Sequence, residues 1–132
     1  MRLNQITVPL IDYAASVAFY QKLGLKLIVD APPRYARFEL PEADGGEPAT
    51  FSIEKVEGWT GGDWPEIWFE SDRLDELVAE LKAKGVAFES EPETMDYLWR
   101  VAHLRDPAGN RITLYHAGRN RRYPPWRVET SA

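Results

Sequence analysis

The stretch DYAASVAFYQKLGLKL, from Asp12 to Leu27, decides the fold of this chain. Asp12 can accept hydrogen bonds from the free backbone N–H groups at the start of a helix. Gly24 supplies the left-handed residue at which helices commonly end. The letters LKLIVD after Gly24 are typical of a strand. The stretch therefore predicts one helix followed directly by one strand.

Further strands are predicted on both sides of this pair. Before it, residues 3–10 alternate in polarity, as Gln5 to Val8 show. After it, the segments RYARFEL (34–40) and ATFSIEKV (49–56) contain aromatic and β-branched residues, and an acidic loop with glycine and proline separates them. The first half of the chain is therefore predicted to run βαβββ.

The second half repeats this order. PEIWFES (65–71) alternates like a strand, and DRLDELVAELKAKG (72–85) is predicted to be a helix that Ser71 or Asp72 caps and Gly85 ends. Its apolar stripe is formed by Leu74, Leu77, Val78 and Leu81. Three more strands are predicted in VAFESE (86–91), YLWRVAHLRD (97–106) and NRITLYH (110–116).

An offset of 61 residues superimposes the two halves, placing Ile6 on Ile67 and Gly24 on Gly85. The apolar positions keep their phase although few residues are identical. The predicted fold class is α+β, with two tandem βαβββ modules. The first module spans residues 1–57 and the second spans residues 65–118. A linker at 58–64 separates them, and a basic tail follows at 119–132. Helices on one face only leave the other face of each sheet to curve around a ligand or to meet a partner.

Composition argues against several classes of function. The net charge of −5 disfavours a general nucleic-acid-binding surface, and no apolar run approaches the ~20 residues of a membrane span. Because the chain has no cysteine, it has no disulfide, thiolate metal site or cysteine nucleophile. The N-terminus lacks the apolar core of a signal peptide, which predicts a cytoplasmic protein.

The tail RNRRYPPWRVETSA carries four arginines against one glutamate. Its Pro124-Pro125 pair stiffens it into an extended arm. We expect this arm to lie across its own module or a partner subunit, with Trp126 as the anchor. A phosphate-binding arm is the alternative.

The stretches DYAASVAFYQKLGLKL and LRDPAGNRITLY (104–115) together resemble the vicinal oxygen chelate superfamily, which includes glyoxalase I, bleomycin resistance proteins and extradiol dioxygenases. In the second stretch, Gly109 is flexible and Asn110 tolerates the left-handed conformation, as a tight turn between adjacent strands requires. The resemblance implies that the mixed sheets form an open, curved, barrel-like pocket. It also implies a homodimer.

In that superfamily four positions hold a metal ion, and the resemblance places them at Gln5, Ser52, Glu66 and Thr113. Divalent ions are held by imidazole nitrogens and by carboxylate or amide oxygens. Gln5 and Glu66 fit this description, whereas the neutral hydroxyls of Ser52 and Thr113 are poor ligands. We therefore expect no tightly bound cofactor. A divalent ion (Ni²⁺, Zn²⁺, Mn²⁺ or Mg²⁺) on Gln5 and Glu66 is the alternative.

Strand parity predicts which side chains face the pocket. They are Gln5, Thr7, Ser52, Glu54, Glu66, Trp68, Thr113 and Tyr115, with Trp99 and His103 as further candidates. Aromatic rings offer flat surfaces for a small organic ligand, and the glutamates favour a cationic or amphipathic one.

Three functions stay open on this sequence. The first is a protein that binds or sequesters a small ligand without a metal. The second is a metal-dependent lyase or isomerase of the glyoxalase type, with Glu66 as a ligand or as the base that removes a proton next to a carbonyl. The third is a structural module whose pocket is vestigial. Extradiol dioxygenase chemistry is disfavoured because it uses two histidines on iron, and neither of the two histidines here is at a matching position.

Overall fold

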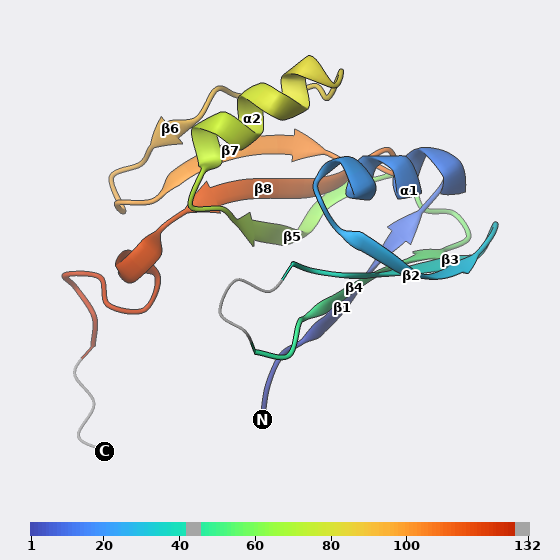
Figure 1. The fold of residues 1–132 in the computed structure, drawn as a ribbon, viewed down its shortest axis with the longest axis horizontal. Coiled ribbons are helices and arrows are strands. Elements are labelled where there is room, and N and C mark those ends of the chain that lie inside the picture. The colour runs from blue at the N-terminus through green and yellow to red at the C-terminus, as the bar shows by residue number, and fades with distance from the viewer. Residues whose placement is uncertain (42–45, 129–132) are drawn as a thin grey trace. The chain divides into compact units, whose positions relative to one another are not determined.

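The computed structural model describes residues 1–41 and 46–128. It divides into two compact units: unit 1 is Met1–Pro65 with Arg105–Arg111, and unit 2 is Glu66–Leu104 with the chain from Ile112 onward. Each half of the chain contributes one α-helix and one mixed four-stranded sheet (Figure 1). The predicted α+β class and the tandem βαβββ order are confirmed.

The first half of the chain forms the first sheet and its helix. In chain order the elements are β1 (Gln5–Leu10), α1 (Tyr13–Lys22), β2 (Lys26–Ala31), β3 (Tyr35–Glu39) and β4 (Thr50–Lys55). The strands lie in the order β1-β4-β3-β2, with β1 parallel to β4 and the other neighbours antiparallel. The parallel pair is the one joined by a crossover, as a βαβββ unit requires.

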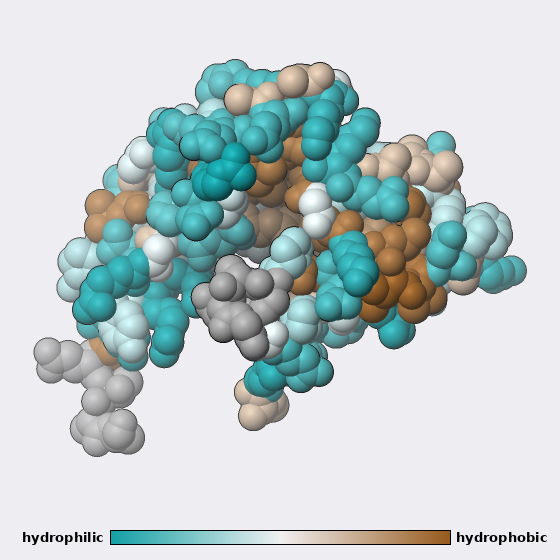
Figure 2. Space-filling model, viewed as in Figure 1, coloured by the Kyte–Doolittle hydropathy of each residue, from teal (hydrophilic) through white to brown (hydrophobic). Residues whose placement is uncertain are grey.

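Helix α1 packs on one face of this sheet. The predicted cap is confirmed, since Asp12 Oδ1 accepts a hydrogen bond from the Ala15 amide at 3.0 Å. Its buried Tyr20 ring lies 4.7 Å from the ring of Phe51 and 5.6 Å from that of Phe38. Some apolar side chains of unit 1, such as Ile28, stay exposed. Figure 2 shows hydrophobic surface in the β2–β3 part of this unit.

The second half forms the second sheet and its helix. The elements are β5 (Gly62–Glu70), α2 (Leu74–Ala83), β6 (Glu93–Thr94), β7 (Arg100–Arg105) and β8 (Asn110–His116), followed by the 3₁₀ turn η1 (Gly118–Arg121). The strand order is β5-β8-β7-β6. Adding the 61-residue offset to both ends of α1 gives both ends of α2. The predicted stripe buries Leu74, Val78 and Leu81.

The predicted cap of α2 is wrong. Arg73 occupies the N-cap position and its side chain makes no capping hydrogen bond. Ser71 Oγ instead accepts from the Arg73 backbone amide at 3.1 Å, which closes a turn before the helix. Arg73 uses its guanidinium on Glu76 and Glu80 along the helix. Helix α2 therefore starts later than the sequence predicted.

Two predicted strands of the second half are also wrong in extent. Residues 86–91 form no strand, and the only strand of the region is the two-residue β6. Pro92, which has no backbone N–H, follows directly. The segment is joined to β7 by isolated hydrogen bonds, such as that from the Glu89 amide to the His103 carbonyl, and not by a ladder. The strand predicted from residue 97 begins at Arg100, because Leu98 adopts a positive φ of 71° and bonds back to Met95 in a turn.

The turn before β8 is built around a buried carboxylate. Asp106 Oδ1 accepts from the backbone amides of Ala108 and Asn110, both at 2.9 Å, and Oδ2 accepts from the Tyr20 hydroxyl at 2.5 Å. Burial and the neighbouring Asp106 raise the pKa of Tyr20 well above 10. The left-handed residue is Gly109, whereas Asn110 lies in the strand and donates to the Pro9 carbonyl at 2.8 Å. The motif therefore joins the turn to α1 and β1 within unit 1.

Among the described residues, no helix is long and apolar enough to cross a membrane.

Candidate functional site

The face of the first sheet opposite α1 is lined with polar side chains. Neighbouring strands bring Thr7 and Arg37 on either side of Ser52, and Gln5 opposite Thr50. The alternating residues of the same strands, such as Phe51 and Phe38, point to the core under α1. The predicted positions of the first half therefore lie on the face that the helix leaves uncovered.

Ser52 is the centre of a hydrogen-bond network on this face. Its side chain is fully buried, and its hydroxyl accepts from Gln5 Nε2 at 2.8 Å. Gln5 Nε2 also lies 3.3 Å from Thr7 Oγ1, and Gln5 Oε1 accepts from the Thr50 hydroxyl. Three of the four predicted residues of unit 1 are thus in contact with one another. The fourth, Glu54, is solvent-exposed at the end of β4.

Two residues of this network were missed by the sequence reasoning. The Tyr35 hydroxyl lies 2.7 Å from Ser52 Oγ, and Arg37 Nε donates to the Tyr35 oxygen at 2.9 Å. The signal was present in the alternation of RYARFEL, which places Tyr35 and Arg37 on the face opposite the buried Ala36 and Phe38. This face therefore carries a guanidinium beside the polar side chains that strand parity predicted for it.

The uncovered face of the second sheet is aromatic. The rings of Trp99 and Tyr115 stack with centroids 4.9 Å apart and an interplanar angle of 21°. Trp68 meets both edge-on, at 5.7 Å from Trp99 and 5.4 Å from Tyr115. The rings come from β5, β8 and the turn before β7, so sheet pairing brings together residues that are distant in sequence.

Polar groups border these rings. Trp68 Nε1 donates to Glu66 Oε2 at 3.2 Å, and His103 Nδ1 lies 2.9 Å from the Thr113 hydroxyl. The imidazole of His103 also meets the Trp68 ring edge-on at 6.4 Å. The six predicted residues of unit 2 therefore form one continuous group. The other histidine, His116, is exposed, and its Nδ1 lies 3.9 Å from Glu70 Oε2.

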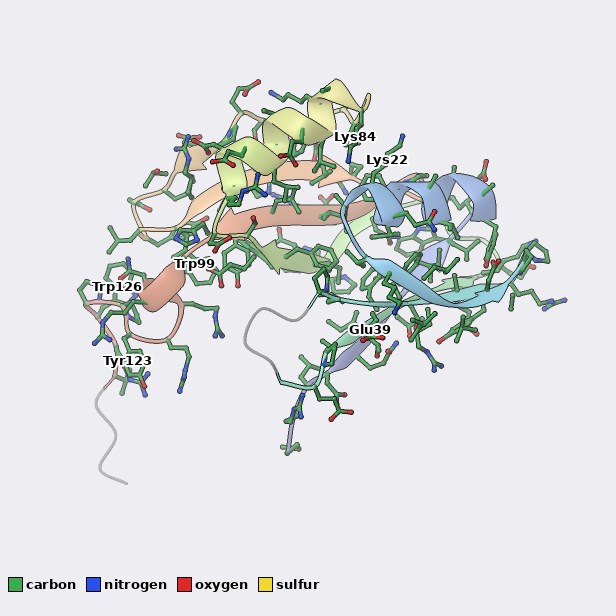
Figure 3. The ribbon with its side chains drawn as sticks, in the orientation of Figure 1. Lys22, Glu39, Lys84, Trp99, Tyr123 and Trp126 are labelled. Carbon is green, nitrogen blue, oxygen red and sulfur yellow. The ribbon has the colours of Figure 1, made fainter. Side chains whose placement is uncertain are left out.

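The start of the tail is held against this group. Trp99 Nε1 donates to the Asn120 carbonyl at 3.3 Å, and Glu70 Oε2 accepts from the backbone amides of Ala117 and Gly118. A hollow of about 230 Å³ lies here, lined by Tyr97, Trp99, Asn120, Arg121, Pro124 and Trp126. Figure 3 labels Trp99 beside the start of the tail, with Tyr123 and Trp126 in the tail. Trp126, the predicted anchor, is 57% exposed, so within unit 2 the anchor is Asn120; residues 129–132 of the predicted tail lie outside the described residues.

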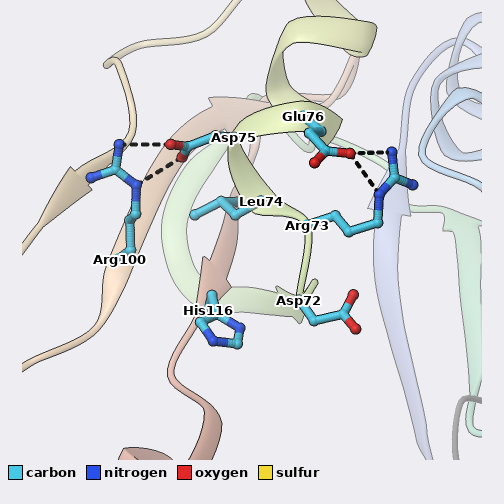
Figure 4. Close-up of a pocket in the computed structure, with 7 residues that line it drawn as sticks. All are labelled: Asp72, Arg73, Leu74, Asp75, Glu76, Arg100 and His116. Carbon is cyan, nitrogen blue, oxygen red and sulfur yellow. Dashed lines mark hydrogen bonds and ion pairs between the residues drawn. The ribbon is translucent and has the colours of Figure 1, made fainter.

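A second hollow of unit 2, about 260 Å³, lies at the start of α2 (Figure 4). Four of its lining charges are paired with one another, because Arg100 Nε lies 2.7 Å from Asp75 Oδ1 and Arg73 Nη2 lies 2.7 Å from Glu76 Oε2. Pairing with Arg100 lowers the pKa of Asp75. This hollow contains none of the predicted site residues, and the four paired charges stabilise one another.

The donors at the four implied metal positions do not fit a tightly held divalent ion. Ser52 and Thr113 are neutral hydroxyls engaged with Gln5 and Tyr35 and with His103, and the Gln5 oxygen is engaged with Thr50. Within residues 1–41 and 46–128, no three His, Cys, Asp or Glu side chains gather as metal ligands do. Gln5 and Ser52 belong to unit 1, and Glu66 and Thr113 to unit 2. That they share one pocket stays a prediction.

Comparisons with known proteins agree with this architecture. Residues 2–114 match the family model described as Glyoxalase/Bleomycin resistance protein/Dioxygenase superfamily. No curated protein gives a significant match.

Several solved structures share the fold. A lactoylglutathione lyase from Agrobacterium tumefaciens is 17% identical, with a TM-score of 0.69 over 87% of this chain and 92% of that one. A bleomycin-binding protein complexed with bleomycin is 19% identical, with a TM-score of 0.68 over 88% and 98%. A glyoxalase/bleomycin resistance protein/dioxygenase from Nocardioides is 20% identical, with a TM-score of 0.72 over 98% and 90%.

Proposed function

The chain belongs to the glyoxalase/bleomycin resistance protein/dioxygenase superfamily, and from this premise we propose that it binds a small organic ligand, without a tightly bound metal ion, through the uncovered faces of its sheets. The observation that carries the proposal is the group of Trp68, Trp99 and Tyr115 on the second sheet. Each ring in it touches the other two.

The geometry of this group suits an aromatic ligand. Trp68 and Trp99 are only half-buried, so part of each ring stays open to a ligand. Tyr115 is buried, stacks on Trp99 and meets Trp68 edge-on. A stacked or edge-on aromatic pair contributes about 0.5–1.5 kcal/mol beyond the area it buries. The Glu66 carboxylate, held by the Trp68 indole, supplies a polar contact at the border of the rings. The ligand is therefore expected to be flat, partly apolar and amphipathic.

Binding can be tested with four probes: indole-3-acetate, indole-3-acetamide, tryptamine and bleomycin. The three indoles share one ring and differ in charge. Bleomycin is included because a structural neighbour binds it. We expect at least one indole to bind in a calorimetric titration, and Trp68→Ala to weaken that binding about tenfold, since one aromatic contact of ~1.4 kcal/mol is lost.

The matched control is Trp64→Ala on the same strand, because the Trp64 side chain is 75% exposed and lies outside the aromatic group. It should bind the probes like the unchanged protein. If none of the four probes binds at millimolar concentration, the binding proposal is wrong and a structural module is favoured.

A metal-dependent lyase with Glu66 as ligand or base is the competing function, and metal content separates the two. After incubation with Ni²⁺, Zn²⁺ or Mn²⁺ and removal of free ion, we expect mass spectrometry to find less than one ion per chain. A stoichiometric ion that disappears in Glu66→Ala would contradict the metal-free proposal. Isomerisation of aldehyde–thiol adducts should then be measured.

A further inference from the structure

Arg37 is held in the middle of the polar face of unit 1. It lies on β3 directly opposite Ser52 of β4, and it is half-buried. Its Nε donates to the Tyr35 oxygen at 2.9 Å, and its guanidinium carbon lies 5.5 Å from the centre of the Tyr35 ring. These two contacts use Nε and one face of the guanidinium. They orient the group and do not use the N–H donors of its two Nη atoms.

The hydroxyls of Tyr35 and Ser52 have one hydrogen more than their mutual contact needs. The Ser52 oxygen already accepts from Gln5, and the Tyr35 oxygen already accepts from Arg37. The 2.7 Å contact between the two oxygens uses one O–H hydrogen, whichever residue donates it. The second O–H hydrogen is left over. A network with a surplus donor lacks an acceptor, and a ligand oxygen can supply it.

The acceptors of the same face do not take up this surplus. Gln5 Oε1 accepts from Thr50. Glu54 and Glu39 lie on the same face, yet within residues 1–41 and 46–128 neither forms a hydrogen bond or ion pair with Arg37. Glu54 is exposed to solvent, and Glu39 lies opposite Lys26 on β2. Among the described residues, the two Nη groups of Arg37 therefore have no acidic partner on this face.

From this geometry we infer that Arg37 and Tyr35 bind a carboxylate of the ligand. The planar end of a guanidinium matches the two oxygens of a carboxylate, and hydrogen bonds between two charged groups are roughly twice as strong as neutral ones. The surplus hydroxyl hydrogen of the Tyr35–Ser52 pair would add a third donor. This inference rests on the proposed function and adds the chemical class of the ligand that the polar face of unit 1 takes: one that carries a carboxylate.

The test compares indole-3-acetate with indole-3-acetamide, which has the same size and no charge. The unchanged protein should bind the acetate about tenfold more tightly than the amide, and Arg37→Gln should abolish that preference while leaving amide binding within about twofold. Arg37→Lys, which keeps the charge but not the planar pair of donors, should retain part of it. Tyr35→Phe should also reduce it.

The matched control is Arg34→Gln. Arg34 lies three residues earlier and is exposed. Its substitution makes the same change of charge outside the network, so this variant should prefer the acetate over the amide as strongly as the unchanged protein does. Equal binding of acetate and amide, or equal losses for both in Arg37→Gln, would overturn the inference while the proposed function stands. Binding of no probe at all would overturn both.

Discussion

Asp106 shows how one residue of a sequence motif can act structurally rather than chemically. It is 4% exposed, and its two oxygens accept four hydrogen bonds, from the Tyr20 hydroxyl, two backbone amides and the Asn110 side chain. A buried carboxylate is tolerated only when its lone pairs are satisfied, and here they are satisfied within unit 1. The turn that carries the family resemblance therefore stabilises the fold and takes no part in the candidate site.

Gly109 in this turn is constrained in two ways. Its φ is +81°, and a Cβ added to it would lie 3.1 Å from the Gly61 Cα. Gly85 has a similar φ of +86°, but an added Cβ there meets nothing within 4 Å. Substituting the two glycines therefore distinguishes the energetic cost of backbone strain from that of close packing.

We predict that Gly85→Ala lowers the free energy of unfolding by about 1 kcal/mol, the cost of a side chain in the left-handed region. Gly109→Ala should cost at least about 1 kcal/mol more, since the Gly61 backbone must also move. Urea denaturation of both variants measures the difference. Equal losses would show that the approach of Gly61 to Gly109 has no energetic importance.

At the scale of elements, both helices were predicted, with the start of α2 placed too early, and the strands were predicted unevenly. Helix ends depend on a few local residues, such as Asp12 and Gly24, which the sequence displays directly. The strand predicted at residues 86–91 does not form, because a strand needs a ladder of hydrogen bonds to a neighbouring strand. Isolated hydrogen bonds, not a ladder, join this segment to β7. Local alternation does not show whether such a ladder forms.

The tail starts in the 3₁₀ turn η1, which belongs to unit 2. Deleting residues 119–132 removes the Asn120 carbonyl that accepts from Trp99 Nε1 and exposes one side of the Trp99 ring. We expect the free energy of unfolding to fall by about 1–3 kcal/mol, from one lost hydrogen bond and part of the apolar burial of a large ring. A red shift of tryptophan emission should accompany the loss.

Trp126→Ala is the control for this deletion. Because Trp126 is more than half exposed, its removal should cost much less than the whole deletion. A deletion variant as stable as the full chain would contradict the docking of the tail.

At the scale of the whole molecule, the homodimer implied by the family resemblance stays a prediction. β1 and β2 lie at the edges of the first sheet, and unpaired strand edges invite pairing or cover. Large side chains such as Trp64 and Val128 are also more than two-thirds exposed. These are features that a partner subunit would cover.

Light scattering coupled to size-exclusion chromatography tests this prediction. We expect a mass of two chains that falls toward one chain on dilution if the interface is weak. The deletion of residues 119–132 measures the contribution of the tail to assembly. A mass of one chain at every concentration would rule out the homodimer.

The candidate site was partly predictable because side-chain parity along a strand is a local property. Parity placed Gln5, Thr7 and Ser52 on one face, and sheet pairing then brought them into contact. Arg37 and Tyr35 were not predicted as site residues although their strand was predicted. The alternation of that strand was not used to assign its side chains to the uncovered face. That face therefore carries an arginine that the predicted set of pocket residues did not include.

By itself, the sequence determined the βαβββ repeat, the ends of α1 and the apolar phase of both helices. These follow from residues within a few positions of one another, whose periodicity and caps are set by backbone geometry. Only the tertiary structure decided that Trp68, Trp99 and Tyr115 form one aromatic group and that Arg37, Tyr35, Ser52 and Gln5 form one network. Such contacts join residues that are far apart in the chain, and they exist only after the strands have paired in register.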